Sequence, residues 1–207
     1  MIEKIKIPSN GTHMDIILSA DEKKEANLFL EKHCTRSKEF IYLNIGGSVS
    51  YKQWPVEQFI ALSNLILNDT SLKIVLGGGP EDTDRINFIN DQISQERVIA
   101  ASNRSLIENC ALIANAKVLV TPDSGPMHIG FSLKIPTISL FWETDCNGLI
   151  RNELNGPNFC GPLNIDESLS SVLCGNFFES NKGVDSESLT SKLILASDVW
   201  EKMLKFL

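Results

Sequence analysis

Polar and ionisable residues crowd one short turn near the middle of the chain. Asp123, Ser124 and Gly125 follow the apolar residues 117–121, and His128 comes shortly after them. A turn from a strand into a helix directs unpaired N–H groups toward the carboxyl edge of a sheet. An anion binds well there, because those donors act together with the helix dipole. The turn therefore predicts phosphate binding; an ordinary strand-to-helix connection without a ligand is the alternative.

The flanking segments explain how this turn would be held. Residues 117–121 and 137–141 are apolar and predict two buried strands, and residues 126–133 between them predict a short helix. Ser124 suits the N-cap of that helix, and Pro126 suits its first turn, where a missing N–H costs nothing.

A second candidate loop follows residues 40–45, another apolar segment that predicts a buried strand. Gly47 would let a ligand approach the backbone, Ser48 can donate a hydrogen bond, and Lys52 can offer a positive charge to phosphate. A helix over residues 55–67 is expected next. Taken alone, the loop is explained equally well as a long turn with a solvated lysine.

A glycine-rich turn after the predicted strand 72–76 is the third candidate loop. Glu81, Asp82 and Asp84 follow the glycines, stand in a first helical turn and would repel phosphate. A carboxylate that accepts hydrogen bonds from ribose hydroxyls is the better interpretation. The spacing fits neither a P-loop nor a dinucleotide fingerprint.

Strands alternate with helices from residue 40 to residue 141, with a further short strand at 97–100 and a helix after it. This order is typical of an α/β fold with a Rossmann-like parallel sheet and helices on both faces. Ligands of such folds lie beyond the carboxyl ends of the strands, where all three loops meet. A diphosphate that carries a sugar and a nucleoside would fit such a site.

The composition narrows the class of protein. A formal charge of −7 over 207 residues argues against broad binding of nucleic acid or anionic membranes. Five cysteines without a CxxC pair and three histidines offer no zinc spacing, and we expect free thiols in a reducing compartment. Residues 1–15 lack the apolar core of a signal peptide, and no apolar run approaches the ~20 residues of a membrane span. These features predict a cytoplasmic protein without a metal site.

Three stretches resemble a known family. The stretch PDSGPMHIGFSLKIPTISLF resembles the D-[ST]-G-x-x-H-[LI]-A motif of the ADP-heptose–lipopolysaccharide heptosyltransferases, glycosyltransferase family 9. IGGSVSYKQWPVEQF resembles the family's earlier donor loop, and VLGGGPED resembles its acidic turn. Members have two Rossmann-like domains in the GT-B arrangement, and this chain resembles the C-terminal, donor-binding half. It departs from the family at residues 141–144, which read FWET where a Phe-Gly-Pro-Thr turn is usual.

The resemblance implies a role for each candidate residue. Amides of Ser124 and Gly125 would hold the donor diphosphate, assisted by Lys52. His128 would contact phosphate or sugar hydroxyls, and Asp123 would bond the sugar or orient His128. Glu81 would hold the ribose, with Asp82 as the alternative. The implied donor-binding residues are Gly47, Ser48, Lys52, Glu81, Asp123, Ser124, Gly125 and His128, with neither a metal nor a cofactor.

The sequence pattern predicts three parts, and the resemblance implies an incomplete enzyme. Residues 1–39 would be a lead-in segment with a connecting helix, residues 40–187 the Rossmann-like nucleotide-sugar-binding domain, and residues 188–207 a C-terminal amphipathic helix; residues 160–182 are expected to be irregular. The catalytic base, an aspartate, belongs to an acceptor domain that residues 1–39 are too short to form. We therefore assign no catalytic residue and expect little transfer by the chain alone.

The expected function is donor binding in heptosyl or hexosyl transfer for lipopolysaccharide or related glycan synthesis, with an ADP-heptose-like nucleotide sugar as substrate. The partner would be an acceptor-domain polypeptide, or a second copy bound through the C-terminal helix. The complete enzyme would be cytoplasmic, at the inner face of the bacterial inner membrane. A non-catalytic nucleotide-sugar-binding module is the alternative. A hydrolase that pairs Ser124 or a cysteine with His128 is disfavoured, because Asp123, Ser124 and His128 share one turn and lack separated triad partners.

Overall fold

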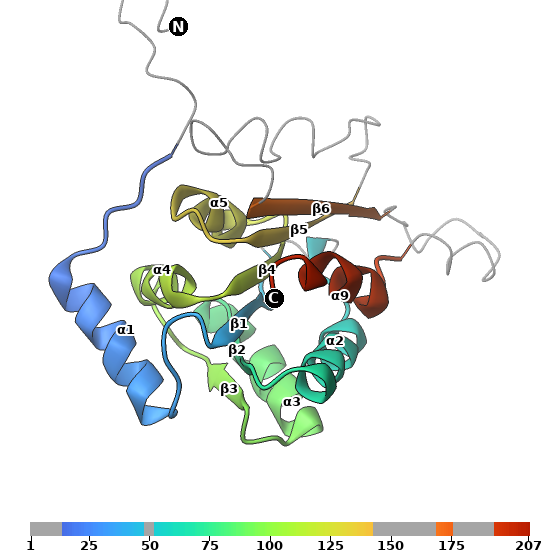
Figure 1. The fold of residues 1–207 in the computed structure, drawn as a ribbon, viewed down its shortest axis with the longest axis horizontal. Coiled ribbons are helices and arrows are strands. Elements are labelled where there is room, and N and C mark those ends of the chain that lie inside the picture. Colours follow the sequence, from blue (N-terminus) through green and yellow to red (C-terminus); the bar gives the residue numbers. More distant parts are fainter. Residues whose placement is uncertain (1–13, 48–51, 143–168, 176–192) are drawn as a thin grey trace, which may run out of the picture.

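The computed structural model describes residues 14–47, 52–142, 169–175 and 193–207. Within these residues, six parallel strands form one sheet between two layers of helices (Figure 1). The strands are β1 (Phe40–Asn44), β2 (Lys73–Gly77), β3 (Val98–Ala101), β4 (Val118–Pro122), β5 (Thr137–Trp142) and β6 (Ser170–Gly175). The helices are α1 (Ala20–Lys32), α2 (Val56–Asp69), the short η3 (Pro80–Asp82), α3 (Thr83–Ile93), α4 (Leu106–Asn115), α5 (Gly125–Ser132) and α9 (Ala196–Leu204).

The strand order β3-β2-β1-β4-β5-β6 confirms the predicted Rossmann-like class. The chain builds outward from β1 to β3 and then returns to place β4 on the other side of β1. The strand order therefore reverses between β1 and β4, and the loops that follow these two strands leave in opposite directions. Such a reversal opens a crevice at the carboxyl edge, which is where ligands of open α/β sheets bind.

Alternation along β1 divides the core into two layers. Ile41 and Leu43 face a cluster that includes residues of α2, α3 and α9, whereas Phe40 and Tyr42 face a cluster that includes residues of α1, α4 and α5. Figure 1 shows these two sets of helices on opposite sides of the sheet. Every residue of β1 is buried, as expected of a central parallel strand.

Helix α1 packs on the sheet domain and is more than a connector. It begins after a capping box at Ser19 and ends at Lys32, within the segment 1–39 where a connecting helix is expected. Its buried residues Ala26 and Leu30 belong to the same core cluster as α4. The charged residues around them make the helix look solvated in the sequence, although one narrow apolar stripe is enough to dock it.

Two predictions near the C-terminus need correction. Residues 160–182 were expected to be irregular, yet Ser170–Gly175 form β6, the edge strand that pairs with β5. Its sequence, SSVLCG, lacks the apolar run by which the central strands are recognised. The terminal helix, expected over 188–207, is α9 at Ala196–Leu204, and residues 188–192 lie outside the described ranges.

Helix α9 is fixed to the start of α2. The indole Nε1 of Trp54 donates to the carbonyl of Ile194 at 2.8 Å, and the amide of Ala196 donates to Gln58 Oε1 at 2.8 Å. Met203 is fully buried in the same cluster as α2. This packing accounts for part of the apolar face that the sequence assigns to the helix; self-association through the remainder stays a prediction.

Candidate functional site

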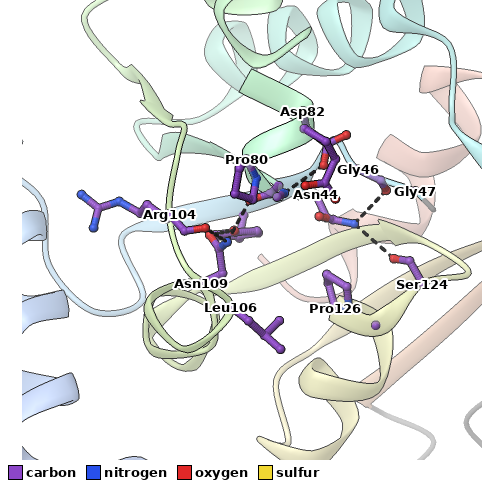
Figure 2. Close-up of a pocket in the computed structure, with 15 residues that line it drawn as sticks. Asn44, Gly46, Gly47, Pro80, Asp82, Arg104, Leu106, Asn109, Ser124 and Pro126 are labelled. Carbon is purple, nitrogen blue, oxygen red and sulfur yellow. Dashed lines mark hydrogen bonds between the residues drawn. The ribbon is translucent and has the colours of Figure 1, made fainter. Parts of the chain in front are cut away.

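A pocket of about 330 Å³ opens at the carboxyl edge of the sheet, at the reversal between β1 and β4. Its walls are the glycine loops after β1 and β2, the start of α4 and the start of α5. Figure 2 shows Pro80 and Asp82 on one side of it and Leu106 and Pro126 on the other. The predicted site residues Gly47, Glu81, Ser124 and Gly125 all line this pocket.

The start of α5 leaves room for a ligand. Ser124 occupies the N-cap position, as predicted, but its hydroxyl makes no capping bond to the helix. It donates instead to the carbonyl of Pro122 at 3.1 Å. A Cβ added at Gly125 would meet no atom within 4 Å, so the backbone of this residue borders open space. The first turn of α5 can therefore receive an anion at close range.

Asn44, which sequence reasoning missed, ties the loop after β1 to the loop after β4. Its side chain is 2% exposed, and Nδ2 lies 3.1 Å from the carbonyl of Gly46, 3.1 Å from Thr121 Oγ1 and 3.2 Å from Ser124 Oγ. Two of these contacts appear in Figure 2. Asn44 could have been recognised from its position, because it is a polar residue at the end of the largely apolar strand FIYLN.

A charged cluster adjoins the pocket beyond Ser124. Lys52 Nζ lies 2.7 Å from Asp123 Oδ2, and the two side chains are 16% and 6% exposed. Burial lowers the pKa of the neighbouring His128, while the charges of Asp123 and Lys52 shift it upward and downward, respectively. The imidazole Nδ1 is buried and makes no hydrogen bond within the described part of the chain. The structure thus gathers three predicted residues into one cluster beside the pocket; Ser48 lies outside the described residues.

Two carboxylates border the wall of the pocket that follows β2. Glu81 is exposed, whereas Asp82 is buried and accepts a hydrogen bond from the amide of Gly79 at 2.9 Å. Burial raises the pKa of Asp82. A Cβ at Gly46 would collide with the Asp82 carboxylate, so this side chain reaches across to the loop after β1. Either carboxylate can meet a ligand, and the choice between them for ribose stays a prediction.

A buried chain of hydrogen bonds also contributes to the lining of the pocket. The Tyr42 hydroxyl donates to Asn109 Oδ1 at 2.7 Å, and Asn109 Nδ2 donates to the carbonyl of Gly78 at 2.8 Å. Burial raises the pKa of Tyr42, so the phenol keeps its proton. A Cβ at Gly77 would strike the Tyr42 hydroxyl, which explains one glycine of the GGG run. Neither Tyr42 nor Asn109 was predicted as a site residue, because each stands within a segment whose apolar residues dominate the pattern.

The sequence model of Glycosyltransferase family 9 (heptosyltransferase) matches residues 2–149. The chain belongs to this family. Lipopolysaccharide heptosyltransferase 1 of Campylobacter coli is 28% identical over 150 residues, which are 70% of this chain and 43% of that protein. Lipopolysaccharide heptosyltransferase 2 of Escherichia coli K12 is 26% identical over 147 residues, 69% of this chain and 38% of that protein. The chain thus spans less than half the length of these two curated relatives.

Solved structures of family members share the fold. The family 9 glycosyl transferase of Veillonella parvula superimposes with a TM-score of 0.73 at 23% identity, over 99% of this chain and 57% of that one. E. coli ADP-heptose lps heptosyltransferase II gives a TM-score of 0.65 at 21% identity, over 93% of this chain and 53% of that one. At these identities the likeness establishes the fold alone: the chain superimposes on somewhat more than half of each of these GT-B glycosyltransferases.

Two further findings concern the described residues. No helix among them is both long and apolar enough to cross a bilayer. Across the same ranges, histidine, cysteine, aspartate and glutamate side chains do not come together in groups of three or more that could hold a metal ion.

Proposed function

We propose that this chain binds a nucleoside diphosphate sugar in the pocket between β1 and β4, as the donor half of a family 9 glycosyltransferase. The observation that carries the proposal is the meeting of three loops at the reversal of strand order. One loop contributes glycines, one contributes carboxylates, and one contributes the open first turn of α5. Each suits a different part of the same ligand.

The diphosphate belongs at the start of α5. The backbone of Gly125 is open to close approach there, with Ser124 and Gly47 in the adjoining walls. Lys52 and His128 stand beside this end and would contact the phosphates or the transferred sugar. Asp123 would bond the sugar or orient His128. Departure of the nucleoside diphosphate places negative charge on the leaving oxygen, and amides at a helix N-terminus together with an ammonium group stabilise such charge.

The nucleoside belongs at the other end, near Glu81 and Asp82. Carboxylates accept hydrogen bonds from ribose hydroxyls and repel phosphate, which orients the ligand along the pocket. We assign the ribose to Glu81, with Asp82 as the alternative. E. coli heptosyltransferase WaaC, a structural neighbour with a TM-score of 0.58, has been solved with ADP-2-deoxy-2-fluoro heptose, and this favours an ADP-sugar as the donor.

The acceptor-binding site and the catalytic base would come from another domain. The relatives are more than twice as long as the region they share with this chain, so a further domain of comparable size is available to supply both. The whole enzyme would transfer heptose or a hexose to a lipopolysaccharide-type acceptor, at the cytoplasmic side of the membrane. A non-catalytic nucleotide-sugar-binding module would share the pocket but would gain no transfer activity when an acceptor domain is added.

Calorimetric titration of the purified chain with ADP, UDP, GDP and their sugars tests the proposal. We expect metal-independent binding of ADP or an ADP-sugar. Lys52→Ala and His128→Ala should weaken binding, whereas Phe88→Leu should leave it unchanged, since Phe88 is exposed on α3 and lies away from the pocket. Failure of every nucleotide to bind, with or without magnesium, would contradict the proposal.

A further inference from the structure

The pocket wall formed by the start of α4 is anchored from outside by α1. Arg104 lines the pocket, yet its guanidinium group points away from Pro80 and Asn109 (Figure 2). The Arg104 Cζ stands 4.1 Å from the ring centroid of Phe29, a residue of α1. The same ring packs against His33 at 4.6 Å between centroids. The Phe29 ring of α1 therefore contacts and orients the side chain of Arg104, which precedes α4.

Arg104 is coupled to the cap of α4 as well. Its Nη1 donates to Glu108 Oε1 at 3.0 Å. The other carboxylate oxygen of Glu108 accepts from the Ser105 amide at 2.8 Å and from the Ser105 hydroxyl at 2.7 Å. The Glu108 amide donates back to Ser105 Oγ at 3.4 Å, which completes a capping box. The hydrogen bonds from Ser105 are the main reason that the pKa of Glu108 is lowered. Phe29, Arg104, Glu108 and Ser105 thus form one chain of contacts that fixes the first turn of α4.

That turn decides the shape of one end of the pocket. Leu106 is 67% exposed and lies across the pocket from Pro80, so its position sets the width of the opening. Asn109, one turn later, holds the carbonyl of Gly78 on the facing loop. The diphosphate end, at Gly125, lies on α5, whereas the side-chain contacts of Arg104 are to Phe29 on α1 and Glu108 on α4. We therefore expect a displacement of Arg104 to alter the α4 end of the pocket more than the α5 end.

We propose that Phe29 is a positioning residue for the nucleoside end of the pocket and that it acts through the side chain of Arg104. The inference rests on the proposed function, because that function assigns the nucleoside to this end. A leucine at position 29 would keep most of the apolar packing but would remove the π-face that attracts the guanidinium. The first turn of α4 would then lose its outer attachment while the α5 turn would stay intact.

Calorimetry with two probes, ADP and inorganic pyrophosphate, distinguishes an effect on the nucleoside end of the pocket from an effect on the diphosphate end. Phe29→Leu should weaken ADP binding about three- to fivefold, the effect of one modest cation–π contact, and should leave pyrophosphate binding unchanged. Phe29→Tyr, which retains an aromatic face, should bind ADP like the unmodified chain. Arg104→Gln should reproduce the selective loss without altering the ring, and it serves if Phe29→Leu folds poorly. Phe88→Leu is the matched control on the opposite helix layer.

Equal weakening of ADP and pyrophosphate would overturn the inference, because it would indicate a general loss of structure. Unchanged ADP binding in both Phe29→Leu and Arg104→Gln would overturn it too. If the unmodified chain bound no ADP, the proposed function would itself fail and the inference would fall with it. These three results differ from one another, so the failure of the positioning role is distinguishable from the failure of the donor site.

Discussion

Lys52 and Asp123 form a largely buried ion pair across the reversal of strand order. The ammonium nitrogen lies 2.7 Å from Oδ2 of the carboxylate and 3.4 Å from the backbone carbonyl of the same residue. Lys52 follows the loop after β1, and Asp123 follows β4, so the pair joins the two loops that border the crevice. The lysine is thus already held near the site before a donor arrives, and a donor phosphate would share it with Asp123.

Lys52→Ala should therefore have two separable effects. The free energy of unfolding should fall by about 2 kcal/mol, because removal of Lys52 leaves the charge of Asp123 buried and unpaired. Affinity for an ADP-sugar should fall about tenfold or more, the usual cost of a lost hydrogen bond from a charged group. Urea denaturation measures the first effect, and calorimetry measures the second.

The double variant Lys52→Ala/Asp123→Asn tells the two effects apart. Without the carboxylate charge, most of the lost stability should return, whereas the affinity should stay low. Recovery of affinity together with stability would mean that Lys52 serves only to neutralise Asp123.

Gly125→Ala should weaken donor binding and leave the fold intact. An added Cβ would enter open space beside the first turn of α5, so stability should change by less than about 0.5 kcal/mol. The same methyl group would occupy the space that a diphosphate needs, and ADP affinity should fall about tenfold. Gly77→Ala is the matched contrast: its Cβ would strike the buried Tyr42 hydroxyl, and it should destabilise the chain by about 1–3 kcal/mol. Unaltered ADP binding by Gly125→Ala would place the diphosphate elsewhere.

Much of the fold can be predicted from the sequence, because central parallel strands are recognisable as short runs of apolar residues. The runs that became β1, β2, β4 and β5 are almost entirely buried wherever the structure describes their burial, and glycine or polar residues follow each of them in the sequence. The strand β6 escaped prediction because an edge strand needs fewer apolar residues. The docking of α1 escaped because its two buried residues are scattered among charges.

The site was predictable only in part, for a related reason. Motif residues such as Ser124 and Lys52 stand in loops, where polar side chains attract notice. Tyr42, Asn44 and Asn109 act from within a strand or a helix, where one polar residue in an apolar pattern reads as an exception. Their partners are far away in the sequence, and only the fold brings them together.

His128 should make donor binding depend on pH. Burial holds its pKa below the usual 6.5, so the ring of the free protein is neutral at pH 7. A phosphate against the ring would raise that pKa in the complex, and binding would then take up a proton. Affinity for an ADP-sugar, whose diphosphate does not titrate in this range, should therefore rise as the pH falls from about 7.5 to 5.5. Calorimetry in buffers of different ionisation enthalpy measures the proton uptake directly.

Asn in place of His128 provides the control for this pH dependence. The amide fills similar space and cannot titrate, so His128→Asn should bind with an affinity that is flat over the same pH range. A rise of equal size in His128→Asn would assign the proton to another group.

Asp82→Asn should stabilise the protein at neutral pH. Burial raises the carboxyl pKa above the 3.8 of the unfolded chain, so the ionised form costs folding free energy. That cost is absent below pH 3.8 and appears in full once the pH has risen through the pKa of the folded state. Asparagine keeps an acceptor for the Gly79 amide but carries no charge. The melting temperature should therefore rise by a few degrees at pH 7, with no gain near pH 3.

The neighbouring Glu81→Gln is a matched control, because Glu81 is exposed and its charge is solvated in both states. At pH 7 it should raise the melting temperature by less than Asp82→Asn does, because the Glu81 charge is a smaller cause of the raised Asp82 pKa than burial is. It should weaken ADP without affecting pyrophosphate, since it removes the carboxylate that we assign to the ribose. If Asp82→Asn weakened ADP selectively and Glu81→Gln did not, the ribose would belong to Asp82. An equal gain in stability for Asp82→Asn at pH 3 and pH 7 would show that ionisation is not the cause.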